Sequence, residues 1–343
     1  MSRFIETIGG ICNTLKENRD INSVQISLER KDLEGFIDWS ISNGIFCRVY
    51  PLISDHVKSN SINHLSKFNA YVGAQKERRV DYFKTIQILS ETCAKNDINY
   101  VVIKSLDKYP DLGKDIDIIV AKEDYSRFKS LLRRHRFFKR ESIYLMLFGR
   151  ELFKNTSLLT EIDLYQRFSR FHERWLSDDH DIFQNNREKE INGHKMPIPS
   201  PEITILLNII ASVYLNGMIN ISGILVIYAE LVSEHFNCDR FISLVERSGI
   251  SHGVLLVLNM VNAITGDTRV ETLYDNIAKN VSIKQQIKSG EVLGDLNFPY
   301  TLPRKVIAGL YYEKFLNGIG KGDMHSVFLI IPLSVLLLNI RSR

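Results

Sequence analysis

The segment Asp115–Val120, which reads DIDIIV, constrains the fold more than any other part of this 343-residue chain. Its run of β-branched residues predicts a strand. Successive side chains of a strand alternate between two faces, so Asp115 and Asp117 share one face, about 7 Å apart along the strand. Ile116 and Ile118 share the other face and point into a core. The segment therefore predicts a sheet with one buried face and a pair of carboxylates on the other.

Two like charges side by side on one strand face repel each other, and strand propensity does not favour aspartate. A hard divalent cation between the carboxylates accounts for such a pair. This segment alone also allows an interpretation without a metal, in which Asp115 ends a turn and Asp117 is a solvated edge residue.

A third carboxylate is expected on another strand, over residues 158–165 (LLTEIDLY). Glu161 and Asp163 share one face there by the same alternation. Asp163 is preferred as the third ligand because its arm matches the pair that it must join, and Glu161 is the reserve. Three carboxylates can hold two metal ions for phosphoryl transfer. The alternative is a strand with one polar face open to water.

Lys104 and Ser105 end an earlier predicted strand, residues 98–103, ten residues before the acidic pair. Backbone N–H groups and a hydroxyl at the start of a helix bind phosphate oxygens, and a lysine adds a point charge. The place of this dipeptide between two strands predicts a phosphate-binding turn.

The surrounding pattern predicts an α+β fold, with a small mixed sheet in a core flanked by helical regions at both ends. Apolar spacing favours a helix over about 70–95 and another over about 123–136. Asn192-Gly193 is a strong signal for a two-residue hairpin between 187–191 and 194–198. Ser200 is placed to cap a helix that has Pro201 in its first turn. Further helical runs are expected at about 201–218, 221–236, 238–248, 253–265, 303–316 and 326–340.

These segments suggest three regions. Residues 1–75 form an N-terminal helical region, 76–198 the core that carries the acids, and 199–343 a C-terminal helical domain.

The array of a strand ending in a small-residue turn, a DxD strand and a third strand carrying an acid resembles the DNA polymerase beta-type nucleotidyltransferase superfamily. Most of that superfamily has Gly-Ser at the turn, where this chain has Lys104-Ser105. The strand NDINYVVIK (residues 96–104), Tyr109-Pro110, the hairpin at Gly193 and the Pro-Ser-Pro-Glu segment are similar to the uncharacterised bacterial and archaeal nucleotidyltransferase family.

This resemblance implies a magnesium-dependent nucleotidyltransferase that moves an NMP from an NTP such as ATP to an acceptor hydroxyl and releases pyrophosphate. Asp115, Asp117 and Asp163 would be catalytic and would hold Mg²⁺, with two ions expected. Lys104 and Ser105 would bind the nucleotide's triphosphate. The acceptor is left open among a small molecule, a tRNA and a protein. The glycine missing at Lys104 motivates the alternative, a non-catalytic nucleotide- or RNA-binding module that keeps the fold.

Composition adds compartment and partner expectations. A net charge of +4 is too small to name a nucleic acid as partner. The four cysteines have no CxxC spacing and no signal peptide is visible, so a reducing cytoplasm is expected. The uncharged run at 326–340 is shorter than a spanning helix and contains Pro332, which favours a buried helix. Contact of this run with a membrane surface is the alternative.

Residues 127–140 hold seven cations and no acid: Arg127, Lys129, Arg133, Arg134, Arg136, Lys139 and Arg140. The apolar residues between them favour an amphipathic helix with a solvated basic side. A phosphate-rich acceptor such as RNA is the functional alternative.

Overall fold

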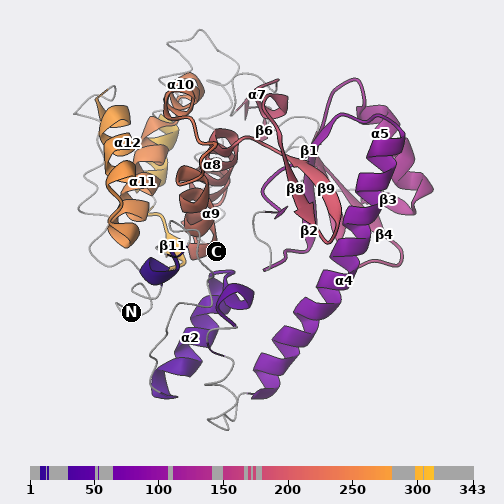
Figure 1. The fold of residues 1–343 in the computed structure, drawn as a ribbon, viewed down its shortest axis with the longest axis horizontal. Coiled ribbons are helices and arrows are strands. Elements are labelled where there is room, and N and C mark those ends of the chain that lie inside the picture. The colour runs from indigo at the N-terminus through magenta and orange to yellow at the C-terminus, as the bar shows by residue number, and fades with distance from the viewer. Residues whose placement is uncertain are drawn as a thin grey trace. The chain divides into compact units, whose positions relative to one another are not determined.

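The computed structural model describes residues 8–12, 14, 30–50, 53, 65–106, 111–140, 150–165, 169–170, 173–174, 180–279, 298–303 and 305–312. The chain divides into two compact units, one made of residues 69–204 and the other of residues 1–68 together with 205–343 (Figure 1). The sheet that carries the acids lies wholly within the first unit. The three-region division at 75 and 198 stays a prediction.

A mixed sheet with the strand order β1-β2-β5-β4-β3 organises the first unit, within the residues described. Only the β2–β5 pair is parallel, and each other neighbouring pair is antiparallel. Its strands are β1 (Tyr100–Val102), β2 (Asp115–Val120), β3 (Phe137–Arg140), β4 (Arg150–Asn155) and β5 (Glu161–Tyr165). The expected α+β fold with a small mixed sheet is confirmed.

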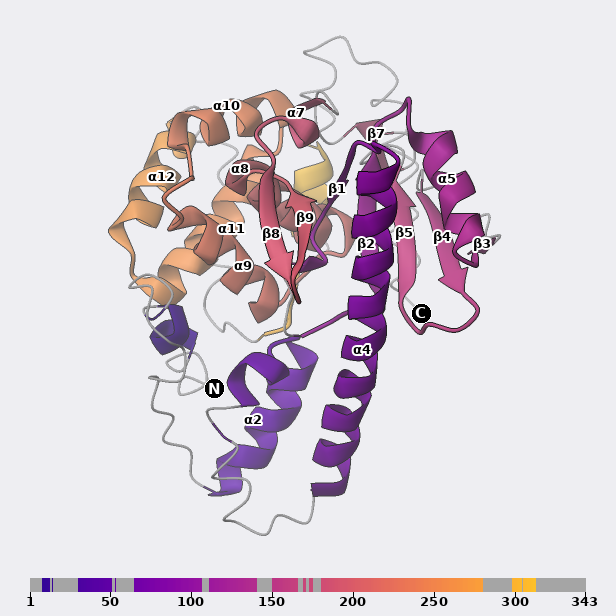
Figure 2. The same ribbon diagram turned by 45° about the vertical axis from the view of Figure 1, so that its right-hand side comes forward.

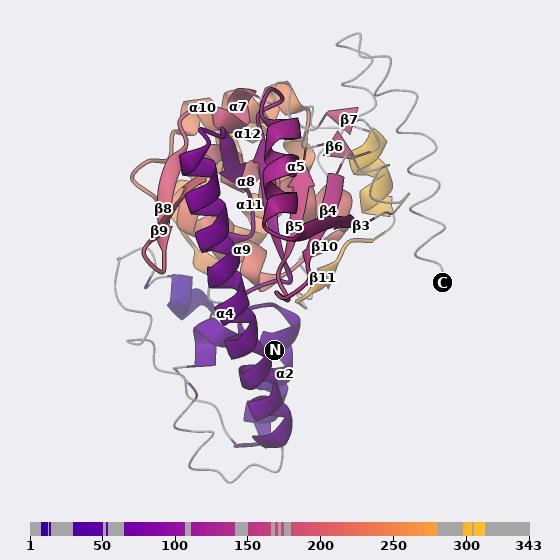
Figure 3. The ribbon, with the colours of Figure 1, turned by 90° about the vertical axis from the view of Figure 1, so that its right-hand side faces the viewer.

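Two helices, α4 (Leu65–Lys95) and α5 (Tyr125–Arg134), pack on one face of this sheet (Figures 2 and 3). The stripe of Tyr82, Ile86, Leu89 and Cys93 on α4 is buried, as its spacing predicts. It packs in one core with Phe128, Leu131 and Leu132 of α5 and with the inward isoleucines of β2, Ile116 and Ile118. The other face of the sheet carries the acids.

A hairpin of β8 (Arg187–Ile191) and β9 (His194–Ile198) closes the core beside β1. Asn192 and Gly193 both have positive φ, 52° and 79°, as a two-residue hairpin turn with the right twist requires. The hydroxyl of Tyr100 on β1 contacts the sulfur of Met196 on β9 at 3.6 Å. Shorter elements of this unit are β6 (Ser169–Arg170), β7 (Glu173–Arg174) and α7 (His180–Phe183).

The second unit is mainly helical. Asn43, which follows α2, joins distant parts of it, since its amide donates to the carbonyl of Phe298 at 3.2 Å and its side-chain oxygen accepts from Ile221 N–H. Its elements include α2 (Arg30–Ser42), the π-helix η3 (Ile210–Leu215), β10 (Met218–Ile219), α9 (Ile221–Leu231), α10 (Cys238–Ser248), α11 (Ser251–Thr265), α12 (Thr268–Ala278), β11 (Tyr300–Thr301) and a helix at 305–312. The helix α8 (Pro201–Ile209) spans the boundary between the units.

Several sequence expectations were wrong in detail. The helix expected over 201–218 is α-helical only to Ile209, where η3 takes over. The Ser200 hydroxyl is buried without a hydrogen bond among the described residues, and the carbonyl of Ser200 instead accepts the Thr204 N–H. The basic stretch is not one helix, because α5 ends at Arg134 and Phe137–Arg140 is a strand. The run at 326–340 lies outside the described residues. Among the described helices, none is long and apolar enough to cross a membrane.

Tyr214 packs tightly against α11. Its hydroxyl donates to the carbonyl of Ile250 and accepts the N–H of Gly253, each at 3.3 Å. A Cβ on Gly253 would lie 2.5 Å from the Tyr214 ring. Two hydrogen bonds hold that ring in place, so moving it away from an added Cβ would break them.

We therefore expect Gly253→Ala to lower the free energy of unfolding by about 1–3 kcal/mol through overpacking. Chemical denaturation followed by circular dichroism measures the change. Gly309→Ala is the matched control, since nothing lies within 4 Å of its added Cβ and the residue is in an exposed helix. That control should be neutral or stabilising by up to about 1 kcal/mol. Equal effects of the two substitutions would contradict the packing argument.

Candidate metal and nucleotide site

Parallel pairing of β2 with β5 brings the predicted acids together. The register sets Asp117 opposite Asp163 and Asp115 opposite Glu161. Directly opposed residues of neighbouring strands point to the same face. Asp115, Asp117 and Asp163 each offer a carboxylate oxygen, and these oxygens lie within 4.8 Å of one another. Asp117 and Asp163 are buried and Asp115 is half-buried.

Lys104 lies at the turn after β1 with φ at +60°, in the left-handed region that favours glycine. Its ammonium is 3.1 Å from the carboxylate of Asp117 and lies 5.2 Å from the ring centre of Tyr165. Burial alone would lower the pKa of Lys104, but Asp117 and the phenol of Tyr165 outweigh burial, and the pKa is raised. The lysine is therefore a fixed cation in the site.

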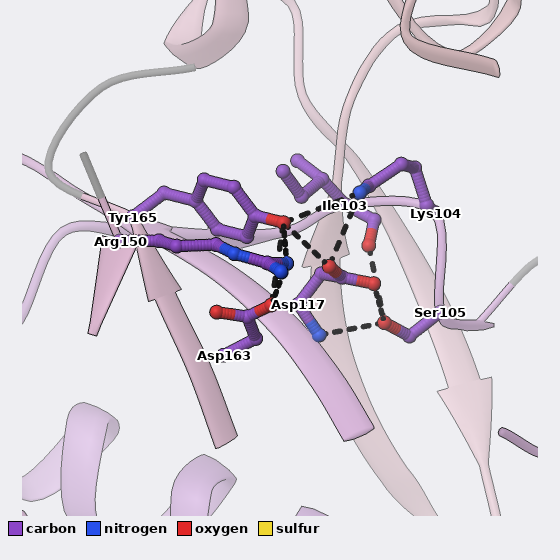
Figure 4. A network of polar contacts seen from close by, with 7 residues as sticks. All are labelled: Ile103, Lys104, Ser105, Asp117, Arg150, Asp163 and Tyr165. Carbon is purple, nitrogen blue, oxygen red and sulfur yellow. Dashed lines mark hydrogen bonds and ion pairs between the residues drawn. The ribbon is translucent and has the colours of Figure 1, made fainter. Parts of the chain in front are cut away.

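Ser105 ties this turn to β2 (Figure 4). Its hydroxyl accepts the N–H of Asp117 at 2.6 Å and donates to the Asp117 carboxylate at 2.8 Å. The Ile103 N–H donates to the Asp117 carbonyl at 2.9 Å, which continues the β1–β2 pairing to the turn. Ser105 thus fixes the orientation of Asp117 rather than facing open solvent.

Two site residues were missed by sequence reasoning, Arg150 on β4 and Tyr165 on β5. The Arg150 guanidinium is 2.5 Å from the Asp163 carboxylate and 3.3 Å from the Tyr165 hydroxyl. That hydroxyl donates to Asp117 at 3.1 Å (Figure 4). Arg150 lies on the face of β4 that Leu152 and Lys154 share, but this alternation places Arg150 only once β4 is known to be a strand.

The buried carboxyl of Asp163 has an unusual pKa. Desolvation by burial, reinforced by the negative charges of Asp117 and Asp115, raises it to about 7, although Arg150 and Lys104 act to lower it. Burial lowers the pKa of Arg150, but Tyr165 and Asp163 raise it overall, so the guanidinium stays charged. Two cations therefore partly neutralise a cluster of three acids.

The reserve residue Glu161 lies outside this cluster. It is not among the described carboxylates that gather within 4.8 Å, and it forms an ion pair with Lys154 on β4. The geometry thus groups Asp163, not Glu161, with the acidic pair.

The carboxylates fit a divalent cation. Oxygen ligands suit magnesium. The Asp163 Oδ1 atom is buried and accepts no hydrogen bond from any described residue. A buried carboxylate oxygen without a partner is costly, and a cation between the three acids would satisfy it.

The small mixed sheet, with its parallel pair of acid-bearing strands and one face covered by helices, is consistent with an α+β nucleotidyltransferase fold. The sequence agrees, because residues 29–266 match the model of a family described as uncharacterised nucleotidyltransferase. The chain belongs to this family, as the resemblance predicted. No curated protein matches the chain.

The Asp163 pKa can be measured directly. With ¹³C-labelled aspartate, the Asp163 carboxyl in the metal-free protein should titrate by NMR with a midpoint near 7. Arg150→Gln removes an attractive cation and should raise the midpoint, whereas Asp117→Asn removes a repelling anion and should lower it. A wild-type midpoint near the ordinary value of about 4 would contradict the argument.

Proposed function

We propose that this chain transfers a nucleoside monophosphate from an NTP to a hydroxyl acceptor in a magnesium-dependent reaction. The observation that carries the proposal is the convergence of three carboxylate oxygens within 4.8 Å on one sheet face, beside a lysine at the preceding turn. Family membership supports nucleotidyl transfer in general. The metal, the nucleotide and the acceptor are parts of the proposal.

In this reaction the acceptor oxygen attacks the α-phosphorus of the NTP and forms a new P–O bond. The bond from that phosphorus to the bridging oxygen of the β-phosphate breaks, and pyrophosphate leaves. The hydroxyl proton passes to a base. The pKa of about 7 for Asp163 belongs to the metal-free protein, and a bound divalent cation would lower it, so Asp163 is proposed as a ligand and not as this base.

Asp115, Asp117 and Asp163 are the proposed ligands of two Mg²⁺ ions. Bound ions of this kind neutralise the triphosphate and lower the pKa of an attacking hydroxyl. Lys104 is proposed to bind the triphosphate as a point charge, with Ser105 holding Asp117 in place.

The direct test is incubation with α-labelled NTPs and cell extract. Asp115→Asn and Asp117→Asn should each reduce label transfer by about a thousandfold or more, because metal clamping supplies several kcal/mol of transition-state stabilisation. Glu188→Gln, an exposed acid on the β8–β9 hairpin, should transfer label like wild type. If the aspartate variants label the acceptor as well as wild type does, the metal assignment is wrong.

A second candidate function is a nucleotide- or RNA-binding module without turnover. The observation that favours it is the pairing of Lys104 with Asp117 and of Arg150 with Asp163, which already offsets part of the acidic charge. Calorimetry with NTP and Mg²⁺, run beside a pyrophosphate-release assay, separates the two candidates. Binding without pyrophosphate release across many acceptors would favour the module.

A further inference from the structure

The strand register extends the acidic face of the sheet to its edge. Arg140 on β3 pairs with Leu152 on β4, which pairs with Asp163 on β5, which pairs with Asp117 on β2. Opposed residues share a face, so Arg140 lies on the face that carries the acids. Neighbouring strands are about 4.8 Å apart, so the Arg140 backbone is about 10 Å from that of Asp163.

A second row of opposed residues has the same order. Phe138 on β3 pairs with Lys154 on β4, which pairs with Glu161 on β5, which pairs with Asp115 on β2. The two rows are therefore neighbours on one face, with an aromatic ring and an arginine at the edge strand and carboxylates two and three strands away.

This part of the face is open, whereas the opposite face is covered. Phe138 is 53% exposed, while its neighbour Phe137, which points to the helices, is fully buried. The Lys154 side chain is 46% exposed, and Leu152 is half-buried. The exposed Phe138 ring is in register with the strands that carry the carboxylates, two and three strands away, and is therefore available for stacking by a ligand that extends from that site.

The cations of the basic stretch fall into two groups. Arg127 pairs with Asp124, and Lys129 and Lys139 both pair with Glu151, so these three are structural. The other four are exposed and make no ion pair within the part of the chain that the structure describes: Arg133, Arg134, Arg136 and Arg140. Arg140 shares a sheet face with Phe138, and Arg136 lies one residue before β3. Arg133 and Arg134 end α5, which packs on the opposite face. Exposed arginines and an exposed aromatic ring on neighbouring elements can bind a phosphodiester chain, because bases stack on the ring and phosphates contact the guanidinium groups.

We propose that this edge of the sheet binds single-stranded nucleic acid and presents its terminal hydroxyl to the carboxylates, which makes nucleic acid the acceptor class. Phe138 stacks against a base, Arg140 contacts the backbone on the same face, and Arg133, Arg134 and Arg136 contact phosphates that continue past β3. The role of nucleic acid as acceptor rests on the proposed nucleotidyl transfer, whereas the binding of nucleic acid to this surface is independent of it.

The test is fluorescence anisotropy of the full chain with labelled single-stranded RNA and DNA of about 12 nucleotides, matched in sequence. Phe138→Ala should weaken binding roughly 5- to 100-fold, as expected for the loss of one base stack. Phe138→Trp should restore it, which excludes misfolding as the cause. Val80→Ala is the matched control, since Val80 is 54% exposed on α4. Preference between the RNA and the DNA identifies the natural chain.

The arginines are tested by salt dependence. Arg140→Gln and Arg136→Gln should each reduce the slope of log affinity against log salt by about 0.7, the value for one phosphate contact on a single strand. Lys76→Gln, an exposed cation on α4, should leave the slope unchanged. Wild-type binding that Phe138→Ala does not weaken, or a lack of binding to both oligonucleotides, would overturn the inference. Competition by polyglutamate that is equally strong for wild type and Phe138→Ala would also overturn it, in favour of a general polyanion surface.

The two proposals fail separately. Asp117→Asn should abolish label transfer but keep oligonucleotide binding. Label transfer to another acceptor without oligonucleotide binding would leave the reaction standing and remove the nucleic-acid surface. Oligonucleotide binding with no transfer from any NTP would support the nucleic-acid surface and contradict the proposed reaction.

Discussion

The pairing of β2 with β5 is the constraint on which the rest of the site depends. Because these two strands run parallel and Asp117 is opposite Asp163, the fold forces carboxylates from distant parts of the chain into one small space. Burying like charges together costs free energy, and a cation beside each of the two buried carboxylates offsets part of that cost. Lys104 reaches Asp117 from the β1 turn and Arg150 reaches Asp163 from β4. Lys104 and Arg150 therefore stabilise the buried carboxylates in the metal-free protein, and the same two cations would attract a triphosphate.

Lys104 explains how the chain does without the glycine that is common at this turn. The backbone keeps the left-handed conformation, with φ at +60°, and a lysine there carries a conformational cost. The ion pair with Asp117 and the contact with Tyr165 offset that cost. Lys104 therefore keeps a left-handed backbone at this turn and adds a charge, which fits both the catalytic and the binding-only proposals.

The sequence predicted the parts of the core whose signals are local. β2 and both hairpin strands begin and end where the alternation and the Asn192-Gly193 turn place them. β3 and β4 were missed because Phe137–Arg140 and Arg150–Asn155 lack β-branched residues and carry charges on their exposed positions. Without those strands neither Arg150 nor the open edge could be placed. The helix α12 was missed although a signal existed, since Asp267 caps it and Val270, Leu273 and Ile277 recur at helical spacing.

The two faces of the sheet show why the missed strands matter for function. Residues that alternate along β3 and β4 divide into a set that packs under α4 and α5, such as Phe137 and Phe153, and a set on the acidic face, such as Phe138 and Leu152. Read as a helix, the basic stretch offers only a solvated charged side. Read as an edge strand, it places Phe138 and Arg140 in register with the carboxylates. Strand pairing, which is a non-local property, thus makes the basic stretch part of a surface that is continuous with the carboxylate site. This continuity supports a single function for the edge surface and the carboxylate site.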